Sequence, residues 1–406
     1  MYDFLKGLRV VEGASFIAGP TCALYLAQMG AEVIRFDTIG GGPDFHRWPL
    51  APGGASFYWE GLNKGKKSIA IDLGSSEGRE LATAIICAPG DNAGFFVTNY
   101  PADGFLAYDR LKAKRADLIC VRVMGWADGT PAVDYTINAA VGVPYMTGPT
   151  ESTAAVNHVL PAWDLLTGAY AAFSLMTAER HRRATGMGFE LRLPLSDVAA
   201  ASLSHMGQVA EVLNTGADRP RYGNALYGAF GRDFLTADGA RLMVVAISRR
   251  QWAGLVKALN LKEAVAQMEA RLGVSFGDDE SVRFRFRDHL FPLFETAFGM
   301  RRLAELAPVL DREHVTWSVY QTLREAVTTD DRLFGQNQIF ETMQHPSGMT
   351  YPTAGPAGTI VGTPRKPVAH APRLGEHTDE VLADILGLSA GEIGRLHDSG
   401  IVAGAS

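Results

Sequence analysis

Residues 8–37 read LRVVEG ASFIAG PTCALYLAQM G AEVIRFD, and this stretch decides the fold. Its first and last blocks are aliphatic runs of strand length, and the block over 20–29 is apolar and long enough for a buried helix. Pro20 suits the first turn of that helix, where the N–H that proline lacks would have no partner. The stretch therefore predicts a β-strand over 8–13, an α-helix over 20–29 and a second β-strand over 31–37.

The alternation of strands and helices continues as far as residue 121. Strands are predicted over 68–72, 94–98 and 118–121, with helices between them over 77–87 and 108–114. Aliphatic strands separated by helices are typical of a parallel sheet that is covered on both faces. The predicted fold class is therefore α/β, with a Rossmann-like parallel sheet in the large domain.

The predicted secondary structure changes near residue 206. Helical patterns over 164–183 and 195–213 come first, and then two short alternating runs joined through Asp238-Gly239 predict a β-hairpin. We expect a large domain over 1–205 and a smaller α+β domain over 206–331. Residues 332–406 should return to the large domain through a long loop over 343–373 and a helix pair that begins near Thr378.

Composition restricts the class of protein. Of the 406 residues, 47% are hydrophobic and 20% are charged, as in globular proteins, and the net charge of -6 argues against nucleic acid as a partner. The first residues lack the pattern of an export signal, and no uncharged apolar run reaches the roughly 20 residues that cross a bilayer. Cys22, Cys87 and Cys120 lie among aliphatic neighbours, which suits a reduced compartment. We therefore expect a cytoplasmic protein without membrane contact.

Common cofactor and catalytic motifs are missing. The turn over 13–20, GASFIAGP, lacks the closely spaced glycines that let a backbone approach a pyrophosphate. The ten histidines show no metal-ligand spacing, and three cysteines do not make a structural zinc site. No Gly-x-Ser-x-Gly segment is present for a serine hydrolase. The sequence therefore predicts no bound metal and no bound cofactor, and it disfavours a dehydrogenase.

One acidic residue stands out in the segment PAWDLLTG over 161–168. Asp164 lies between an apolar run and the start of a predicted buried helix. A carboxylate in that place is either an ordinary N-cap or a nucleophile held in a dry pocket. Local pattern alone favours the N-cap, because Asp is among the preferred capping residues.

Seven segments, taken in order, resemble the class III CoA-transferases, a family that also includes the α-methylacyl-CoA racemases. Each segment alone is weak, but their order and spacing are specific. The segments are GLRVVE over 7–12, IAGP over 17–20, GAEVIR over 30–35, LNKGKKSIAIDL over 62–73, VTNY over 97–100, PAWDLLTG over 161–168 and APRLGEHT over 371–378.

This resemblance implies that Asp164 is the catalytic nucleophile, which reverses the preference for an N-cap. In the family, the aspartate attacks an acyl-CoA thioester to form a mixed anhydride, and CoA thiolate then converts the anhydride to an aspartyl-CoA thioester. A positioned and partly desolvated carboxylate can do this without a partner base. Backbone amides at a helix N-terminus would stabilise the developing oxyanions. The resemblance also implies an interlocked homodimer, with CoA present only as part of the substrate.

A second acidic residue, Asp134, matches a position that assists some transferases of the family. It is equally compatible with a satisfied structural carboxylate. In the racemases of the family a proton-transferring histidine precedes this aspartate, whereas this sequence has Val133. Valine cannot move a proton, so the resemblance favours transfer of CoA over racemisation.

The resemblance places CoA along the first turn and beside two later strands. The residues implied are Phe16, Ile17, Ala18, Ile71, Asn99 and Tyr100. Basic residues that often meet the CoA phosphates are replaced here by Thr38 and Gly74. The cations left for phosphate contacts are Arg35, Arg47 and Lys66, together with Lys64 and Lys67.

With these replacements at the basic positions and the bulky Trp163 before Asp164, the sequence most resembles one branch of the family. That branch moves CoA between the two carboxyl groups of one C5 dicarboxylate, mesaconate. A narrow cavity would retain the released acid while it reorients. One alternative is transfer between two dicarboxylic acids, such as from succinyl-CoA to a second acid. Another is a non-catalytic protein that binds acyl-CoA.

Overall fold

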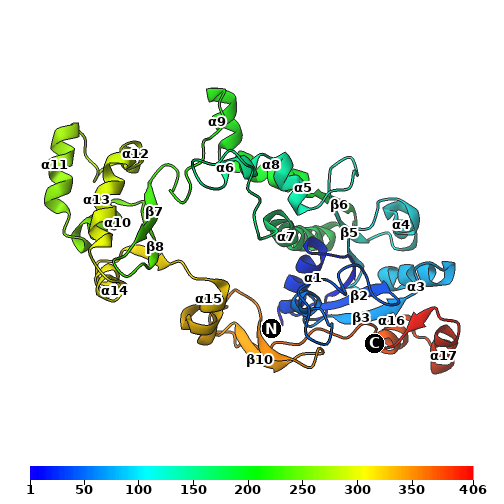
Figure 1. Ribbon diagram of the computed structural model, residues 1–406. Coiled ribbons are helices and arrows are strands. Elements are labelled where there is room, and N and C mark those ends of the chain that lie inside the picture. The colour runs from blue at the N-terminus through cyan, green and yellow to red at the C-terminus, as the bar shows by residue number, and fades with distance from the viewer. Residues whose placement is uncertain (406) are drawn as a thin grey trace. The chain divides into compact units, whose positions relative to one another are not determined.

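The computed structural model describes residues 1–405, and the chain divides into two compact units (Figure 1). Unit 1 comprises residues 1–141, 158–216 and those from 337 onward, and unit 2 comprises residues 142–157 and 217–336. The boundaries expected from the sequence were 205 and 331. The two units instead change at 216/217 and 336/337, and the short segment 142–157 also belongs to unit 2.

Unit 1 is built on a seven-stranded sheet in the order β12-β3-β2-β1-β4-β5-β6. All neighbouring strands pair in parallel except β12, which is antiparallel to β3. The predicted α/β fold class with a large parallel sheet is confirmed. The strands are β1 (Arg9–Gly13), β2 (Glu32–Thr38), β3 (Lys67–Ile71), β4 (Phe95–Thr98), β5 (Ile119–Met124), β6 (Glu190–Pro194) and β12 (Val402–Ala403).

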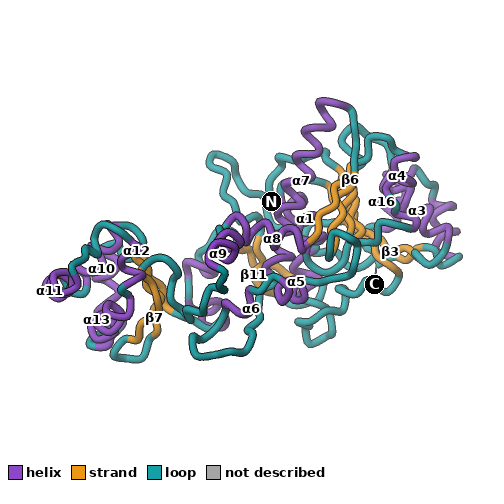
Figure 2. The backbone as a smooth tube through the Cα atoms, turned by 90° about the horizontal axis from the view of Figure 1, so that it is seen from above, coloured by secondary structure: helices purple, strands orange, loops and turns teal. Residues whose placement is uncertain are grey.

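Helices cover both faces of this sheet, as Figure 2 shows. Side chains from α1 (Ala18–Gln28) and α7 (Ala162–Thr185) join one apolar core, and those from α3 (Ser76–Cys87), α4 (Tyr108–Lys114) and α16 (Thr378–Leu386) join the other. Burial on both faces explains why the strand sequences are aliphatic runs without strict alternation. Within residues 1–405, none of the helices has both the length and the apolarity that a membrane crossing requires.

Shorter elements complete unit 1. The helical pattern over 195–213 forms two helices, because Gly207 adopts a left-handed φ of 76° that ends the first. The remaining elements are α2 (Phe57–Leu62), η1 (Gly104–Leu106), α5 (Asp134–Ala140), α8 (Leu195–His205), α9 (Gln208–Thr215) and α17 (Ala390–Asp398).

Part of the segment predicted as a loop over 343–373 is a β-hairpin. β10 (Phe340–Gln344) pairs antiparallel with β11 (Thr350–Ala354). Its turn is held by Glu60, whose carboxylate accepts from the Ser347 backbone N–H at 2.7 Å and from the Tyr351 hydroxyl at 2.5 Å. The prediction was wrong here because Pro352 and the polar strand residues conceal the hairpin from sequence patterns.

Unit 2 has a three-stranded antiparallel sheet with helices packed on it. β7 (Phe230–Leu235) and β8 (Arg241–Ala246) form the hairpin predicted around Asp238-Gly239, and β9 (Thr316–Val319) pairs with β8. Phenylalanines from β7 and from one helix fill its core. The helices are α6 (Val143–Met146), α10 (Arg249–Ala258), α11 (Lys262–Leu272), α12 (Glu280–Arg285), α13 (Arg287–Gly299), α14 (Leu303–Arg312), α15 (Leu323–Thr329) and η2 (Asp331–Gly335).

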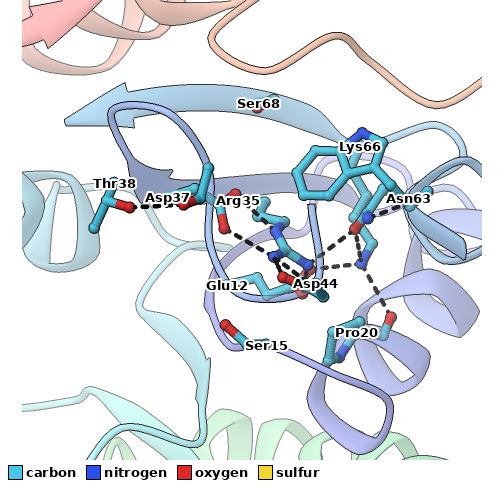
Figure 3. Close-up of polar contacts among 12 residues, drawn as sticks. Glu12, Ser15, Pro20, Arg35, Asp37, Thr38, Asp44, Asn63, Lys66 and Ser68 are labelled. Carbon is cyan, nitrogen blue, oxygen red and sulfur yellow. Dashed lines mark hydrogen bonds and ion pairs between the residues drawn. The ribbon is translucent and has the colours of Figure 1, made fainter. Parts of the chain in front are cut away.

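A buried ionic cluster lies beside β1, β2 and β3 (Figure 3). The guanidinium of Arg35, only 1% exposed, donates to Asp37 at 2.8 Å and to Asp44 at 3.0 Å. Lys66 lies 2.7 Å from Glu12 and also donates to the Pro20 carbonyl of α1 at 3.0 Å. The cluster therefore ties the three strands to the start of α1.

The charges of this cluster depend on one another. Burial alone would lower the pKa of Arg35, but Asp37, Glu12 and Asp44 hold its pKa well above the usual value. Two uncharged side chains also surround Arg35. Its guanidinium lies 4.6 Å over the indole of Trp59 and donates to the side-chain oxygen of Asn63. Removal of one cation would leave several carboxylates buried without compensation.

We therefore expect Arg35→Met to lower the free energy of unfolding by about 3 to 5 kcal/mol, the range for breaking a buried ion network. Lys67→Met is the matched control, because Lys67 on β3 pairs with Glu32 and Glu380 but is about a quarter exposed. The control should cost about 1 kcal/mol or less. Urea unfolding midpoints measure both. Equal losses of unfolding free energy in the two variants would contradict a special contribution of the buried ionic cluster to stability.

Candidate active site

The sheet order creates a crevice between β1 and β4. From β1 the chain builds the sheet toward β2 and β3, whereas from β4 it builds toward β5 and β6. At such a switch point the connections leave on opposite sides, and ligands of parallel α/β sheets bind outside the carboxyl ends of the two strands. The residues that follow Gly13 and Thr98 are therefore the first candidates for a site.

A cavity of about 650 Å³ lies at this place. The segments after β1, β4 and β5 form most of its wall, and the first turn of α7 completes it. Its lining includes five of the residues predicted to bind CoA and the predicted nucleophile. These six are Phe16, Ile17, Ala18, Asn99, Tyr100 and Asp164.

The two loops at the switch point are tied together. The Asn99 side chain accepts from the Ser15 backbone N–H at 3.1 Å and donates to the Ser15 carbonyl at 2.9 Å. Next to this pair, Phe16 adopts a left-handed φ of 69°, which is rare for a bulky residue. Such strain persists only where the surroundings fix it, and the reciprocal amide pair supplies that restraint.

Asp164 is the third residue of α7, and the helix brings it close to the start of α1. One turn further on, Gly168 faces Ala18 and Thr21 of α1. A Cβ built at Gly168 would lie 2.9 Å from the Ala18 carbonyl oxygen and 2.7 Å from the Thr21 Cβ. Only glycine allows this approach, so the two helix N-termini lie together at the cavity wall.

Asp134 fixes the first turn of α7. Its carboxylate, in a residue 1% exposed, accepts through Oδ2 from the backbone N–H groups of Trp163 at 2.7 Å and Asp164 at 3.1 Å. The N-cap of α7 is Pro161, which has no side-chain acceptor. The N-cap interpretation of Asp164 is therefore wrong, because the first-turn amides are satisfied by an acid from α5.

The carboxyl group of Asp164 is held at an unusual pKa. Burial raises the pKa to about 7, the negative charge of Asp134 also raises it, and the positive charge of Arg47 lowers it. These are the desolvation and charge effects that tune functional carboxyls. At neutral pH a large share of Asp164 is ionised in a poorly solvated setting, which suits a nucleophile.

Three of the residues predicted to bind CoA lie elsewhere. Arg35 and Lys66 belong to the buried ionic cluster, and Ile71, with no exposed surface, belongs to the core beneath α16. None of the three lines the cavity. Phosphate binding by Arg35 or Lys66 is not supported by this placement, because their charges are already neutralised by carboxylates.

Arg47 remains an exposed cation beside the cavity wall. Its guanidinium lies 5.5 Å over the ring of Phe16 and 5.4 Å over the ring of Tyr58. The Tyr58 hydroxyl is buried without a hydrogen-bond partner, and its pKa is raised, chiefly by burial. Sequence reasoning missed Tyr58, because a tyrosine in a short helix carries no motif.

His158 is the other residue that sequence reasoning missed. Its Nε2 lies 2.6 Å from Oδ1 of Asp134, on the side of the carboxylate opposite the two amides. His158 and Asp134 are far apart in the chain, and the stretch between them has no periodic pattern that predicts their contact. Within residues 1–405, no group of three or more His, Cys, Asp or Glu residues is arranged to hold a metal ion.

Comparison with known proteins identifies the family of the chain. The sequence profile described as CoA-transferase family III matches residues 5–378. Over 405 residues the chain is 51% identical to 2-methylfumaryl-CoA isomerase of Chloroflexus aurantiacus, with 100% of this chain and 99% of that protein covered. It is 25% identical over 412 residues to succinyl-CoA:glutarate CoA-transferase of Homo sapiens, with 98% and 90% covered.

The fold has counterparts among solved structures. A crystal structure of a CAIB/BAIF family protein from Brucella suis superposes with a TM-score of 0.76 at 23% identity, covering 95% of this chain and 100% of that chain. At this identity the likeness supports the fold alone. The profile match over most of the length, together with the relative at 51% identity, shows that the chain belongs to CoA-transferase family III.

Proposed function

We propose that this enzyme moves CoA from one carboxyl group of mesaconate to the other, and so converts 2-methylfumaryl-CoA to 3-methylfumaryl-CoA within one molecule. The relative at 51% identity over the whole length carries the name 2-methylfumaryl-CoA isomerase. The observation that carries the proposal is the placement of Asp164, a partly buried carboxyl with a pKa of about 7, at the wall of the cavity.

The first half of the reaction makes Asp164 the acyl carrier. An oxygen of its carboxylate attacks the thioester carbonyl carbon, the C–S bond breaks and CoA leaves as the thiolate. The product is a mixed anhydride between Asp164 and one carboxyl group of mesaconate. The thiolate then attacks the carbonyl carbon of Asp164, which releases mesaconate and leaves an aspartyl-CoA thioester.

The second half repeats these steps with the other carboxylate. Mesaconate turns over in the cavity, and its second carboxylate attacks the aspartyl thioester and releases the thiolate. The thiolate then attacks the acyl carbon that belongs to mesaconate, which forms the isomeric thioester and restores Asp164. Every bond that breaks is balanced by one that forms, so neither water nor a further cofactor is consumed.

The cavity suits this sequence of steps. Its volume of about 650 Å³ lies within the range of small-molecule sites and accommodates a C5 acid with the end of the pantetheine arm. Two of the amides at the start of α7 already donate to Asp134, so the oxyanion donors expected from that helix must be sought elsewhere. The first turn of α1 at Ala18 is the nearest alternative.

Two further parts of the proposal concern binding and assembly. Arg47 is the predicted phosphate ligand that remains exposed beside the cavity, and we assign the contact with CoA to it. The exposed apolar residues along α7, Leu166, Tyr170 and Phe173, are compatible with the proposed homodimer. The second candidate function is transfer between two dicarboxylic acids, the activity named for the Homo sapiens relative.

Asp164→Asn should abolish isomerisation, with kcat reduced by about 10³-fold or more, because an amide cannot form the anhydride. Hydroxylamine or borohydride added during turnover should modify Asp164 of the native enzyme, as read by peptide mass spectrometry. Asp103→Asn is the matched control, since Asp103 also lines the cavity but has no role in the proposed steps. Persistence of native activity in Asp164→Asn would refute the mechanism.

Isotope-labelled free mesaconate distinguishes transfer within one molecule from exchange between molecules. With excess labelled acid present during turnover of 2-methylfumaryl-CoA, the product thioester should remain unlabelled, because the released acid stays in the cavity. A transferase that accepts free mesaconate provides the positive control. Incorporation at the level of the labelled pool would favour the intermolecular candidate.

The rate should depend on pH through Asp164. Because the attacking group is the ionised carboxylate, kcat/KM should fall as the pH drops below about 7 and level off above it. Arg47→Gln removes the charge that lowers the pKa of Asp164, so the acid limb should move to higher pH. Arg110→Gln, at an exposed arginine on α4, should leave the limb in place. A native acid limb near pH 4 would argue against a raised pKa.

A further inference from the structure

Asp134 and His158 contact each other shortly before the start of α7, although the segment 142–157 lies between them in the sequence. Residues 142–157 belong to unit 2, and His158 is the first residue of unit 1 after this excursion. Asp134 opens α5 just before the excursion, and Asp164 follows just after it. The helix α7, which carries the proposed nucleophile, therefore begins shortly after a segment that belongs to unit 2.

Besides the two amide hydrogen bonds to Asp134, three further contacts join α5 to the segment that follows the excursion. Asp134 meets His158 Nε2 at 2.6 Å, the Tyr135 hydroxyl donates to the Val159 carbonyl at 3.3 Å, and Trp163 Nε1 donates to Asn138 at 3.1 Å. The first is the shortest and involves a charge. Of the three, only the first shares an acceptor group with the backbone of Asp164.

The carboxylate of Asp134 is saturated by donors on both oxygens. Oδ2 accepts the amides of Trp163 and Asp164, and Oδ1 faces His158 Nε2. A carboxylate that is 1% exposed needs such hydrogen-bond partners, because burial deprives it of water. Nε2 must carry a proton in this contact, because an ionised carboxylate only accepts.

The imidazole of His158 is itself held by its neighbours. Its side chain is 20% exposed, and its ring lies 5.9 Å from the ring of Tyr135 and 6.4 Å from that of Trp163. Two aromatic rings therefore contact the imidazole, whose Nε2 lies toward Asp134. The carboxylate is thereby prevented from turning about its χ2 torsion and releasing the two amides.

We propose that His158 is a positioning residue for the nucleophile: it locks the Asp134 carboxylate on the first-turn amides of α7 and so fixes the backbone of Asp164 at the cavity. His158 touches neither substrate nor CoA in this scheme. The role deepens the proposed function and rests on it, because the position of Asp164 matters only if Asp164 reacts. Misplacement of a reacting group by about 1 Å can cost about 100-fold in rate.

The kinetic test compares three variants. His158→Ala should lower kcat by about tenfold or more with KM within about threefold, because orientation rather than binding is lost. His158→Gln, whose Nε2 can still donate to Asp134, should recover most of that kcat. His397→Ala is the matched control: it removes a histidine from another contact with an aspartate, 2.7 Å from Asp379, and should leave kcat unchanged.

A second measurement does not need the substrate. Hydrogen exchange of the Trp163 and Asp164 amides in the full-length protein should accelerate in His158→Ala, return toward native in His158→Gln and stay native in His397→Ala. Unchanged kcat and unchanged exchange in His158→Ala would overturn the proposal. So would a loss of kcat that His158→Gln does not restore and that comes with faster exchange throughout unit 1, since that pattern reports only a general structural role.

The two proposals can fail separately. If the native enzyme does not isomerise 2-methylfumaryl-CoA, the proposed function fails, and the exchange of the two amides still decides whether His158 holds the first turn of α7. If the native enzyme is active and His158→Ala behaves like His397→Ala, the positioning role fails alone.

Discussion

The first-turn amides of α7 need an acceptor that their own segment does not provide, and the carboxylate of Asp134 supplies it. This single interaction sets two properties of the site. It anchors the backbone that carries Asp164, and it places a buried negative charge near the Asp164 carboxyl, where it helps to raise the pKa. The carboxylate that anchors the backbone of Asp164 thus also affects how readily the Asp164 carboxyl ionises.

Other contacts in unit 1 fix the elements against which α7 packs. The buried cluster around Arg35 and Lys66 joins three parallel strands, and through the Pro20 carbonyl it reaches the helix that packs against α7. The cavity opens where the sheet order reverses, between the loops tied by Asn99 and Ser15. A crevice is expected at this place for topological reasons, and the first turn of α7 brings the Asp164 carboxyl to its wall.

Five strands of the large sheet and the β7–β8 hairpin could be predicted from the sequence because each is a local pattern. Aliphatic runs marked β1 to β5, and Asp238-Gly239 marked the turn between β7 and β8. β6 and β12 could not be found in this way, since Glu190–Pro194 mixes charged and apolar residues and β12 has only two residues. Their strands form because a neighbouring strand accepts them.

The site was predictable only where a family motif marked it. Local pattern alone favoured an N-cap for Asp164, and the likeness to class III CoA-transferases corrected this. The burial of Arg35 was itself predictable, since an arginine between Ile34 and Phe36 lies in a strand that is buried on both faces. The contact of His158 with Asp134 has no local signature at all, because it forms across an excursion into another unit.

The close approach at Gly168 has a consequence for how such enzymes can diverge. This position has no functional group, yet any side chain there would press on α1 and draw the first turn of α7 back from the cavity. Substitutions at Gly168 would therefore resemble active-site lesions in a screen for activity, although no polar atom is lost. The position of Asp164 at the cavity therefore depends on the absence of a Cβ atom at Gly168, one helical turn away.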